Sequence, residues 1–165
     1  MAFVCSICGE THEGLAARVL HYPDPWLALS DEEREAGKIS SDLCRTPKGE
    51  YFVRAVLELP LIGGPEPTIE FGVWGSLSET NFYRYVETYD DLDQSKLGAM
   101  FTYLSNELRG FPQSFALPGD LFPQDNGRPM LVLKDVDHPL ATAQVAGVEF
   151  QKVLEIIHPS ETPHV

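Results

Sequence analysis

Tyr51-Phe52-Val53-Arg54-Ala55-Val56-Leu57-Glu58-Leu59 and, a little further on, Thr68-Ile69-Glu70-Phe71-Gly72-Val73-Trp74-Gly75-Ser76-Leu77 carry the strongest strand signals in this chain. Both stretches are rich in β-branched and aromatic residues, which favour strands over helices. The connection between them, residues 60–67, holds two glycines and three prolines. Two strands joined by so short a connection predict an antiparallel pair at the centre of the fold.

Helix signals lie on both sides of this pair. Ser30 and Glu33 have the capping-box spacing and predict a short polar surface helix that ends at Gly37. Ser78 is expected to cap a second helix. The apolar residues of that helix recur at helical spacing, at Phe82, Tyr85, Val86 and Tyr89.

The second half of the chain gives weaker signals. Residues 98–105 fit a third strand or a short helix, and residues 114–122 and 129–134 predict strands on either side of an Asn126-Gly127 turn. Asp137 is expected to cap a helix that begins with His138 and Pro139 and ends at Gly147.

A last amphipathic helix is predicted over residues 148–157. Strands cluster in the middle with helices on either side, which predicts an α+β fold with a mainly antiparallel central sheet. At 165 residues the chain fits one domain. We expect a metal-binding region over residues 1–44, packed on an α+β body of residues 45–158, and a frayed tail over residues 159–165.

The charge balance excludes some partners. The net charge is −13, and the 12 basic residues are scattered rather than clustered, so we expect no binding to nucleic acid or to anionic membranes. A protein partner is compatible with this charge, especially a basic one. No stretch approaches a membrane span, and the N-terminal residues lack a secretory signal pattern, which predicts a cytoplasmic protein.

The three cysteines predict a metal site. Two of them lie in Cys5-Ser6-Ile7-Cys8-Gly9-Glu10-Thr11-His12, and the third is Cys44. Cys5, Cys8, His12 and Cys44 supply the four ligands that a closed, structural zinc site needs, so we expect one Zn²⁺ ion. His21 is the alternative fourth ligand.

Two other interpretations of the cysteines remain. They can be small buried apolar residues, or Cys5 and Cys8 can form a redox pair, although the strand-to-helix context of such a pair is missing here. His138 stands beside Asp137, but Asp137 is explained as a helix cap, so we expect a structural role for His138. The chain contains no nucleophile elbow, P-loop or dinucleotide fingerprint.

Several motifs occur together in this chain: Cys5-x-x-Cys8-Gly9-x-x-His12, Ser41-Asp42-Leu43-Cys44, Tyr51-Phe52-Val53-Arg54, Leu57-Glu58-Leu59-Pro60-Leu61, Gly72-Val73-Trp74, Ser76-Leu77-Ser78 and Asp137-His138-Pro139-Leu140-Ala141. Together they resemble one bacterial family, domain of unknown function 2199. The resemblance runs from about residue 3 to residue 158 and has no assigned activity to transfer, so it implies one domain and no catalytic residues.

Two functional hypotheses follow. The first is a zinc-stabilised protein-interaction module without enzymatic activity, of which an immunity or antitoxin-like protein is one form, because an acidic surface can steer a basic toxin. The second is an enzyme with a pocket near Arg54, Glu58 and Trp74. Arg54 and Glu58 share one face of their strand by period two, whereas Trp74 is more simply explained as a core residue of its strand. An enzyme should show a concave site with convergent polar groups, whereas an interaction protein should show an exposed apolar or acidic face. The oligomeric state is left open.

Overall fold

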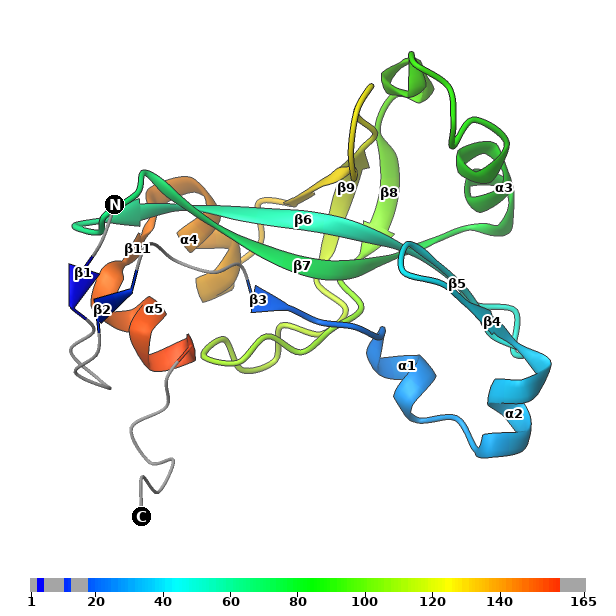
Figure 1. The fold of residues 1–165 in the computed structure, drawn as a ribbon, viewed down its shortest axis with the longest axis horizontal. Coiled ribbons are helices and arrows are strands. Elements are labelled where there is room, and N and C mark those ends of the chain that lie inside the picture. The colour runs from blue at the N-terminus through cyan, green and yellow to red at the C-terminus, as the bar shows by residue number, and fades with distance from the viewer. Residues whose placement is uncertain (1–2, 5–10, 13–17, 158–165) are drawn as a thin grey trace.

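A long antiparallel hairpin forms the spine of the molecule. The computed structural model describes residues 3–4, 11–12 and 18–157 (Figure 1). Strands β6 (Tyr51–Ile62) and β7 (Thr68–Leu77) pair from Tyr51↔Leu77 to Pro60↔Thr68, which confirms the predicted pair. Alternate residues of β6 enter the main core. Those that are completely buried are Val53, Ala55, Leu57 and Leu59.

The hairpin lies inside a larger mixed sheet. The strand order is β3 (Arg18–Val19), β7, β6, β10 (Met130–Leu133), β9 (Pro118–Phe122) and β8 (Met100–Tyr103). β10 is parallel to β6, and β3 is parallel to β7, whereas the other neighbours in this order are antiparallel. β4 (Lys38–Ile39) and β5 (Leu43–Arg45) add a small hairpin on β6, and β11 (Val148–Glu149) runs parallel to the far end of β6.

The sheet curls back on itself. After β8, Leu104 forms a bridge with Gly75 of β7, and Ser105 N donates to Trp74 O at 2.8 Å. Gly75 allows this approach, since a Cβ at that position would lie 2.5 Å from Oγ1 of the buried Thr102. The curled sheet encloses the main hydrophobic core.

Helices occupy the two ends and one side of the hairpin (Figure 1). α1 (Asp24–Leu27) and α2 (Asp31–Ala36) lie near the β4–β5 end, and α4 (Pro139–Ala146) and α5 (Phe150–Ile157) lie near the other. α3 (Glu79–Glu87) follows β7, and a short 3-10 helix, η1 (Gln94–Leu97), precedes β8. β1 (Phe3–Val4) and β2 (Thr11–His12) form a separate antiparallel pair.

The predicted caps of α2 and α3 are confirmed. Ser30 Oγ accepts from Glu33 N, and Glu33 Oε1 accepts from Ser30 N, which completes the capping box at the start of α2. At α3, Ser78 Oγ accepts from Asn81 N at 3.2 Å. The residues between 98 and 105 form a strand, β8, and not a helix.

Three predictions about the C-terminal half are wrong in detail. The cap of α4 is His138, not Asp137, because the helix begins at Pro139 and His138 Nδ1 accepts from Leu140 N at 3.0 Å. β9 begins only at Pro118, since Ala116 has a φ of 68° and cannot continue a strand. The predicted helix over residues 148–157 is a two-residue strand, β11, followed by α5.

The fold is α+β with a curled mixed sheet, so the predicted class is confirmed, although three strand pairs among the described residues are parallel. Cys5 and Cys8, which form the core of the predicted zinc loop, lie outside the described residues, as does the predicted tail of residues 159–165. A second, smaller apolar cluster lies on the outer face of the hairpin. It consists of Trp26, Leu29, Cys44, Phe52 and Trp74, with Ile39 packed against it.

Candidate functional site

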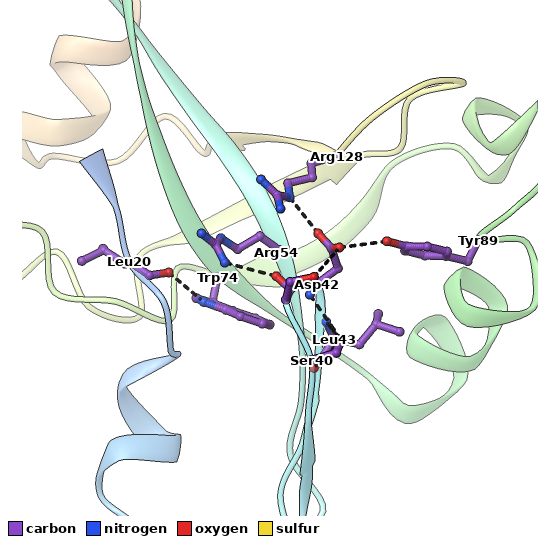
Figure 2. Close-up of polar contacts among 9 residues, drawn as sticks. Leu20, Ser40, Asp42, Leu43, Arg54, Trp74, Tyr89 and Arg128 are labelled. Atoms are coloured by element: carbon purple, nitrogen blue, oxygen red, sulfur yellow. Dashed lines mark hydrogen bonds and ion pairs between the residues drawn. The ribbon is translucent and has the colours of Figure 1, made fainter. Parts of the chain in front are cut away.

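Arg54 and Trp74 face each other across the hairpin. They are directly paired in the β6–β7 register, and the guanidinium carbon of Arg54 lies 5.5 Å from the centre of the Trp74 ring (Figure 2). Arg54 is 5% exposed and Trp74 is 0% exposed. Of the three residues of the predicted pocket, the structure brings Arg54 and Trp74 together but not Glu58. Glu58 pairs with Glu70 further along the hairpin, and no described contact joins it to Arg54.

Trp74 is part of the protein interior. Its indole Nε1 donates to Leu20 O at 3.0 Å, and its backbone N donates to Asn106 Oδ1 at 2.8 Å. These bonds tie β7 to the segment before α1 and to the chain after β8. The expectation that Trp74 is a core residue is confirmed. Its buried ring provides the surface against which the Arg54 side chain packs.

Arg54 is a buried cation with few partners. Its Nη1 donates to Ser41 O at 3.1 Å, whereas its Nε is buried and has no hydrogen-bond partner among the described residues. Burial lowers the pKa of Arg54, the nearby Arg128 lowers it further, and Asp42 acts in the opposite direction. The positive charge of Arg54 is therefore only partly compensated by the negative groups around it.

Asp42 joins three parts of the chain that are distant in sequence. Arg128 Nε donates to Asp42 Oδ1 at 2.7 Å, and Tyr89 OH donates to Asp42 Oδ2 at 2.9 Å (Figure 2). Ser41 Oγ donates to the same Oδ2 at 3.1 Å. Burial alone would raise the pKa of Asp42, but the hydrogen bonds from Arg128 and Tyr89 outweigh it and lower the pKa. Asp42 is ionised at neutral pH.

The turn between β4 and β5 holds Asp42 in place. Ser40 N donates to Leu43 O at 2.8 Å, and Ser40 Oγ accepts from the backbone N of both Asp42 and Leu43. A serine that binds the backbone two and three residues on is a common way to stabilise such a turn. Sequence reasoning missed the roles of Asp42, Tyr89 and Arg128, since 86 residues separate the ion-paired Asp42 and Arg128.

Cys44 lies in β5, in the smaller apolar cluster beside Trp26 and Phe52. It is 1% exposed, and burial together with the nearby Glu50 raises the pKa of its thiol to about 12. Of the other predicted ligands, Cys5 and Cys8 lie outside the described residues. His12 belongs to β2. Within the described part of the chain, no group of three His, Cys, Asp or Glu side chains is arranged to hold a metal.

His138 borders a groove of about 680 Å³ that is also lined by Asp137, Lys152 and Glu155. Both of its ring nitrogens are engaged, because Nδ1 accepts from Leu140 N and Nε2 lies 2.9 Å from Pro112 O. His138 therefore supports the start of α4 and the preceding loop. This agrees with the structural role expected for it from the sequence.

An exposed, largely apolar face covers the outside of β8, β9 and β10. Its residues alternate with buried ones along each strand, and we call it the aromatic face: Phe101, Tyr103, Phe122 and Val132, which are 47%, 49%, 39% and 44% exposed. One charged residue lies within it, Asp120, which pairs with Phe101 and Val132 in the strand register and forms an ion pair with Lys134. The rings of Phe101 and Tyr103 meet edge to face at 4.9 Å. Outward positions of an antiparallel sheet are normally polar, so this composition is unusual.

An acidic loop borders one end of the aromatic face. Residues 90–93 contain three aspartates and Leu92, which is 89% exposed. The loop leads into η1, where Ser95 N donates to Asp125 Oδ1 at 3.0 Å. Asp125 belongs to the β9–β10 connection, so this contact holds the acidic loop at the end of the strands where β8 begins and β9 ends.

A family model described as "Uncharacterized protein conserved in bacteria (DUF2199)" matches residues 4–148. The chain belongs to this family. The DUF2199 match includes the hairpin, the Asp42 turn, Arg128 and the aromatic face. The chain matches no curated protein and no solved structure. In the part of the chain that the structure describes, no helix combines the length and the apolar character needed to cross a membrane.

Proposed function

We propose that this chain is a protein-interaction module without enzymatic activity, and that it binds a basic protein partner through the aromatic face. The observation that carries the proposal is the alternation along β8. Met100 and Thr102 are buried in the core, whereas Phe101 and Tyr103 stand outward and about half exposed. Aromatic residues are favoured at the centres of interfaces, since they bury much area at low entropic cost.

The charge of the molecule supports a basic partner. The net charge is −13, and the acidic loop places Asp90, Asp91 and Asp93 beside an exposed Leu92. An exposed apolar side chain flanked in the sequence by carboxylates favours a partner whose own apolar patch is bordered by Lys or Arg. The immunity or antitoxin-like role is the specific form that we propose, because a basic toxin is a partner of this kind. The same charge disfavours nucleic acid.

We also propose that one structural Zn²⁺ ion is held by Cys5, Cys8, His12 and Cys44, with His21 as the alternative to His12. The spacing Cys5-x-x-Cys8-Gly9 supports the proposal, since it lets two thiolates point at one centre. The site would tie the start of the chain to β5, which carries Cys44, whereas in Figure 1 β2, which carries His12, lies near the opposite end of the hairpin. Zinc would displace the proton of the Cys44 thiol on binding.

The enzyme hypothesis has weaker support. It requires Arg54, Glu58 and Trp74 to converge, but Glu58 faces Glu70 at a different position on the hairpin. Asp42 is occupied by three donors. Glu58 is therefore not placed to act with Arg54, and Asp42 is engaged by its three donors rather than available as a general acid or base.

The test is affinity capture from a lysate of the source bacterium with three baits. These are the wild-type chain, the double variant Phe101→Ser/Phe122→Ser, and Val145→Ser as a control. Val145 is 87% exposed on α4, so this control removes an exposed apolar side chain away from the aromatic face. We expect a basic protein to be retained by the wild type and by Val145→Ser and lost by the double variant. Identical captured proteins for all three baits would contradict the proposal.

A further inference from the structure

Arg54 is unusual among the charged residues of the molecule. It is 5% exposed, and its Nε is the buried side-chain atom that lacks a hydrogen-bond partner in the described part of the chain. Its described contacts are a backbone carbonyl, Ser41 O, and the ring of Trp74. A buried cation of this kind is costly unless an anion compensates it.

We propose that Arg54 and Arg128 form a binding site for a small oxyanion, a carboxylate or a phosphate group, on the outer face of the β6–β7 hairpin. This site is separate from the aromatic face. It does not depend on the protein-interaction function proposed above.

The geometry of Arg54 defines how an oxyanion would bind. Nη1 is used by Ser41 O, which leaves the edge formed by Nε and Nη2. That edge matches the spacing of two oxygens of a carboxylate or phosphate, and such bidentate pairs are among the strongest hydrogen bonds in proteins. The guanidinium carbon lies over the Trp74 ring, 5.5 Å from its centre, so Trp74 limits one side from which an oxyanion could approach.

Gly72 lies close to this edge. It is two residue pairs away from the Arg54–Trp74 pair on the hairpin, opposite Val56, and a Cβ built on it would come into van der Waals contact, at 3.6 Å, with Arg54 Nη2 and with Val19 Cα. Any larger side chain at this position would occupy the space beside Nη2. A glycine inside a strand often marks a place where a ligand or another backbone approaches closely.

The second cation, Arg128, strengthens the site. It contacts Asp42 through Nε, and 44% of its side chain is exposed, so it is the outer of the two arginines (Figure 2). Because the two arginines lie close together, Arg128 lowers the pKa of Arg54. Asp42 is satisfied by Arg128, Tyr89 and Ser41. The group of Arg54, Arg128 and Asp42 therefore carries a net charge of +1 in a protein whose net charge is −13.

The test uses wild-type protein labelled with ¹⁵N and observes the Nε–Hε resonance of Arg54. Inorganic phosphate and acetate are titrated separately against sodium chloride at constant ionic strength. We expect a saturable shift of this resonance with at least one of the two anions, together with a higher thermal midpoint. The anion that binds more tightly shows whether the site prefers a phosphate or a carboxylate group.

Variants separate the site from general effects of salt. Arg54→Lys keeps the charge but loses the Nε–Nη2 edge, and we expect it to weaken binding about tenfold or more. Arg128→Gln should weaken binding by a smaller factor, and Arg84→Gln, at an exposed position on α3, should not change it. If Arg54→Lys does not fold, the wild-type titration and Arg128→Gln decide alone. No saturable shift with either anion, or equal binding by Arg128→Gln and Arg84→Gln, would overturn the proposal.

Discussion

Phe101 and Tyr103 meet edge to face on the outside of β8, with ring centres 4.9 Å apart and ring planes at 89°. Aromatic pairs in this arrangement are common inside proteins, where both rings are buried. Here both rings are about half exposed, while the residues between and before them are buried. The outside of β8 therefore has the composition of a core without a described element that covers it.

Phe101 should contribute little to folding. We expect Phe101→Ala to lower the free energy of unfolding by less than about 1 kcal/mol, whereas Phe71→Ala should lower it by about 3 to 5 kcal/mol. Phe71 is 1% exposed in the main core and Phe101 is 47% exposed, which is the reason for the difference. Urea unfolding of both variants measures it. Equal losses would show that Phe101 is a structural residue.

Asn106 should be important for stability. Its Oδ1 accepts from Trp74 N at 2.8 Å, and its Nδ2 donates to Tyr22 O at 2.9 Å and to Asp24 Oδ1 at 3.1 Å. Asn106→Ala removes these partners, so we expect a loss of about 2 to 4 kcal/mol in urea unfolding. The control is Asn126→Ala in an exposed loop, for which we expect less than about 0.5 kcal/mol. A small effect at Asn106 would mean that water replaces its bonds.

Glu107 should make stability depend on pH. Its carboxylate accepts from Phe115 N at 2.9 Å and Gln113 N at 2.8 Å, and these bonds lower its pKa below the ordinary value of 4.5. A lowered pKa in the folded state adds stability above the unfolded pKa, and this stability is lost as the pH falls through the folded pKa.

We therefore expect Glu107→Gln to be less stable than the wild type at neutral pH, and the difference to shrink as the solution becomes acidic enough to protonate Glu107. Urea midpoints measured across this range test the expectation. The control is Glu35→Gln, at an exposed position on α2, which should show a smaller difference. A constant difference at every pH would show that the charge of Glu107 is not the cause.

Removal of zinc should destabilise the protein. We expect about one Zn²⁺ per chain by elemental analysis, and a lower thermal midpoint after treatment with a chelator. Cys44→Val distinguishes the metal site from the alternative in which Cys44 is only a buried apolar residue. Valine keeps an apolar side chain in the cluster of Trp26 and Phe52 but cannot bind metal. Loss of zinc in Cys44→Val is the expected result. A zinc content near zero in the wild type would refute the metal site.

Local patterns predicted the parts of the fold that depend on neighbouring residues. The β-branched and aromatic run from Tyr51 predicted β6, and Ser30 with Glu33 predicted the start of α2. The parallel pairing of β10 with β6 was not predictable in this way, since Met130 and Val56 lie far apart in the sequence. Contacts of that kind depend on the whole fold.

The candidate site shows the same limit. Arg54 and Trp74 both stand in strong strand segments, and the β6–β7 register places them opposite each other. Glu58 was grouped with Arg54 by its period-two spacing, but four residues along a strand separate the two side chains too far for contact. The link from Asp42 to Arg128 depends on the turn at Ser40 and on the β9–β10 connection, and no short sequence pattern reports both.

The most direct test of the central claim, that the aromatic face binds a basic protein, is the affinity of the purified chain for the partner that the wild type captures. Isothermal titration calorimetry should give a weaker affinity for Phe101→Ser/Phe122→Ser, by about tenfold or more, while Val145→Ser binds like the wild type. All three chains should have similar thermal midpoints. Equal affinities for the wild type and the double variant would contradict the claim.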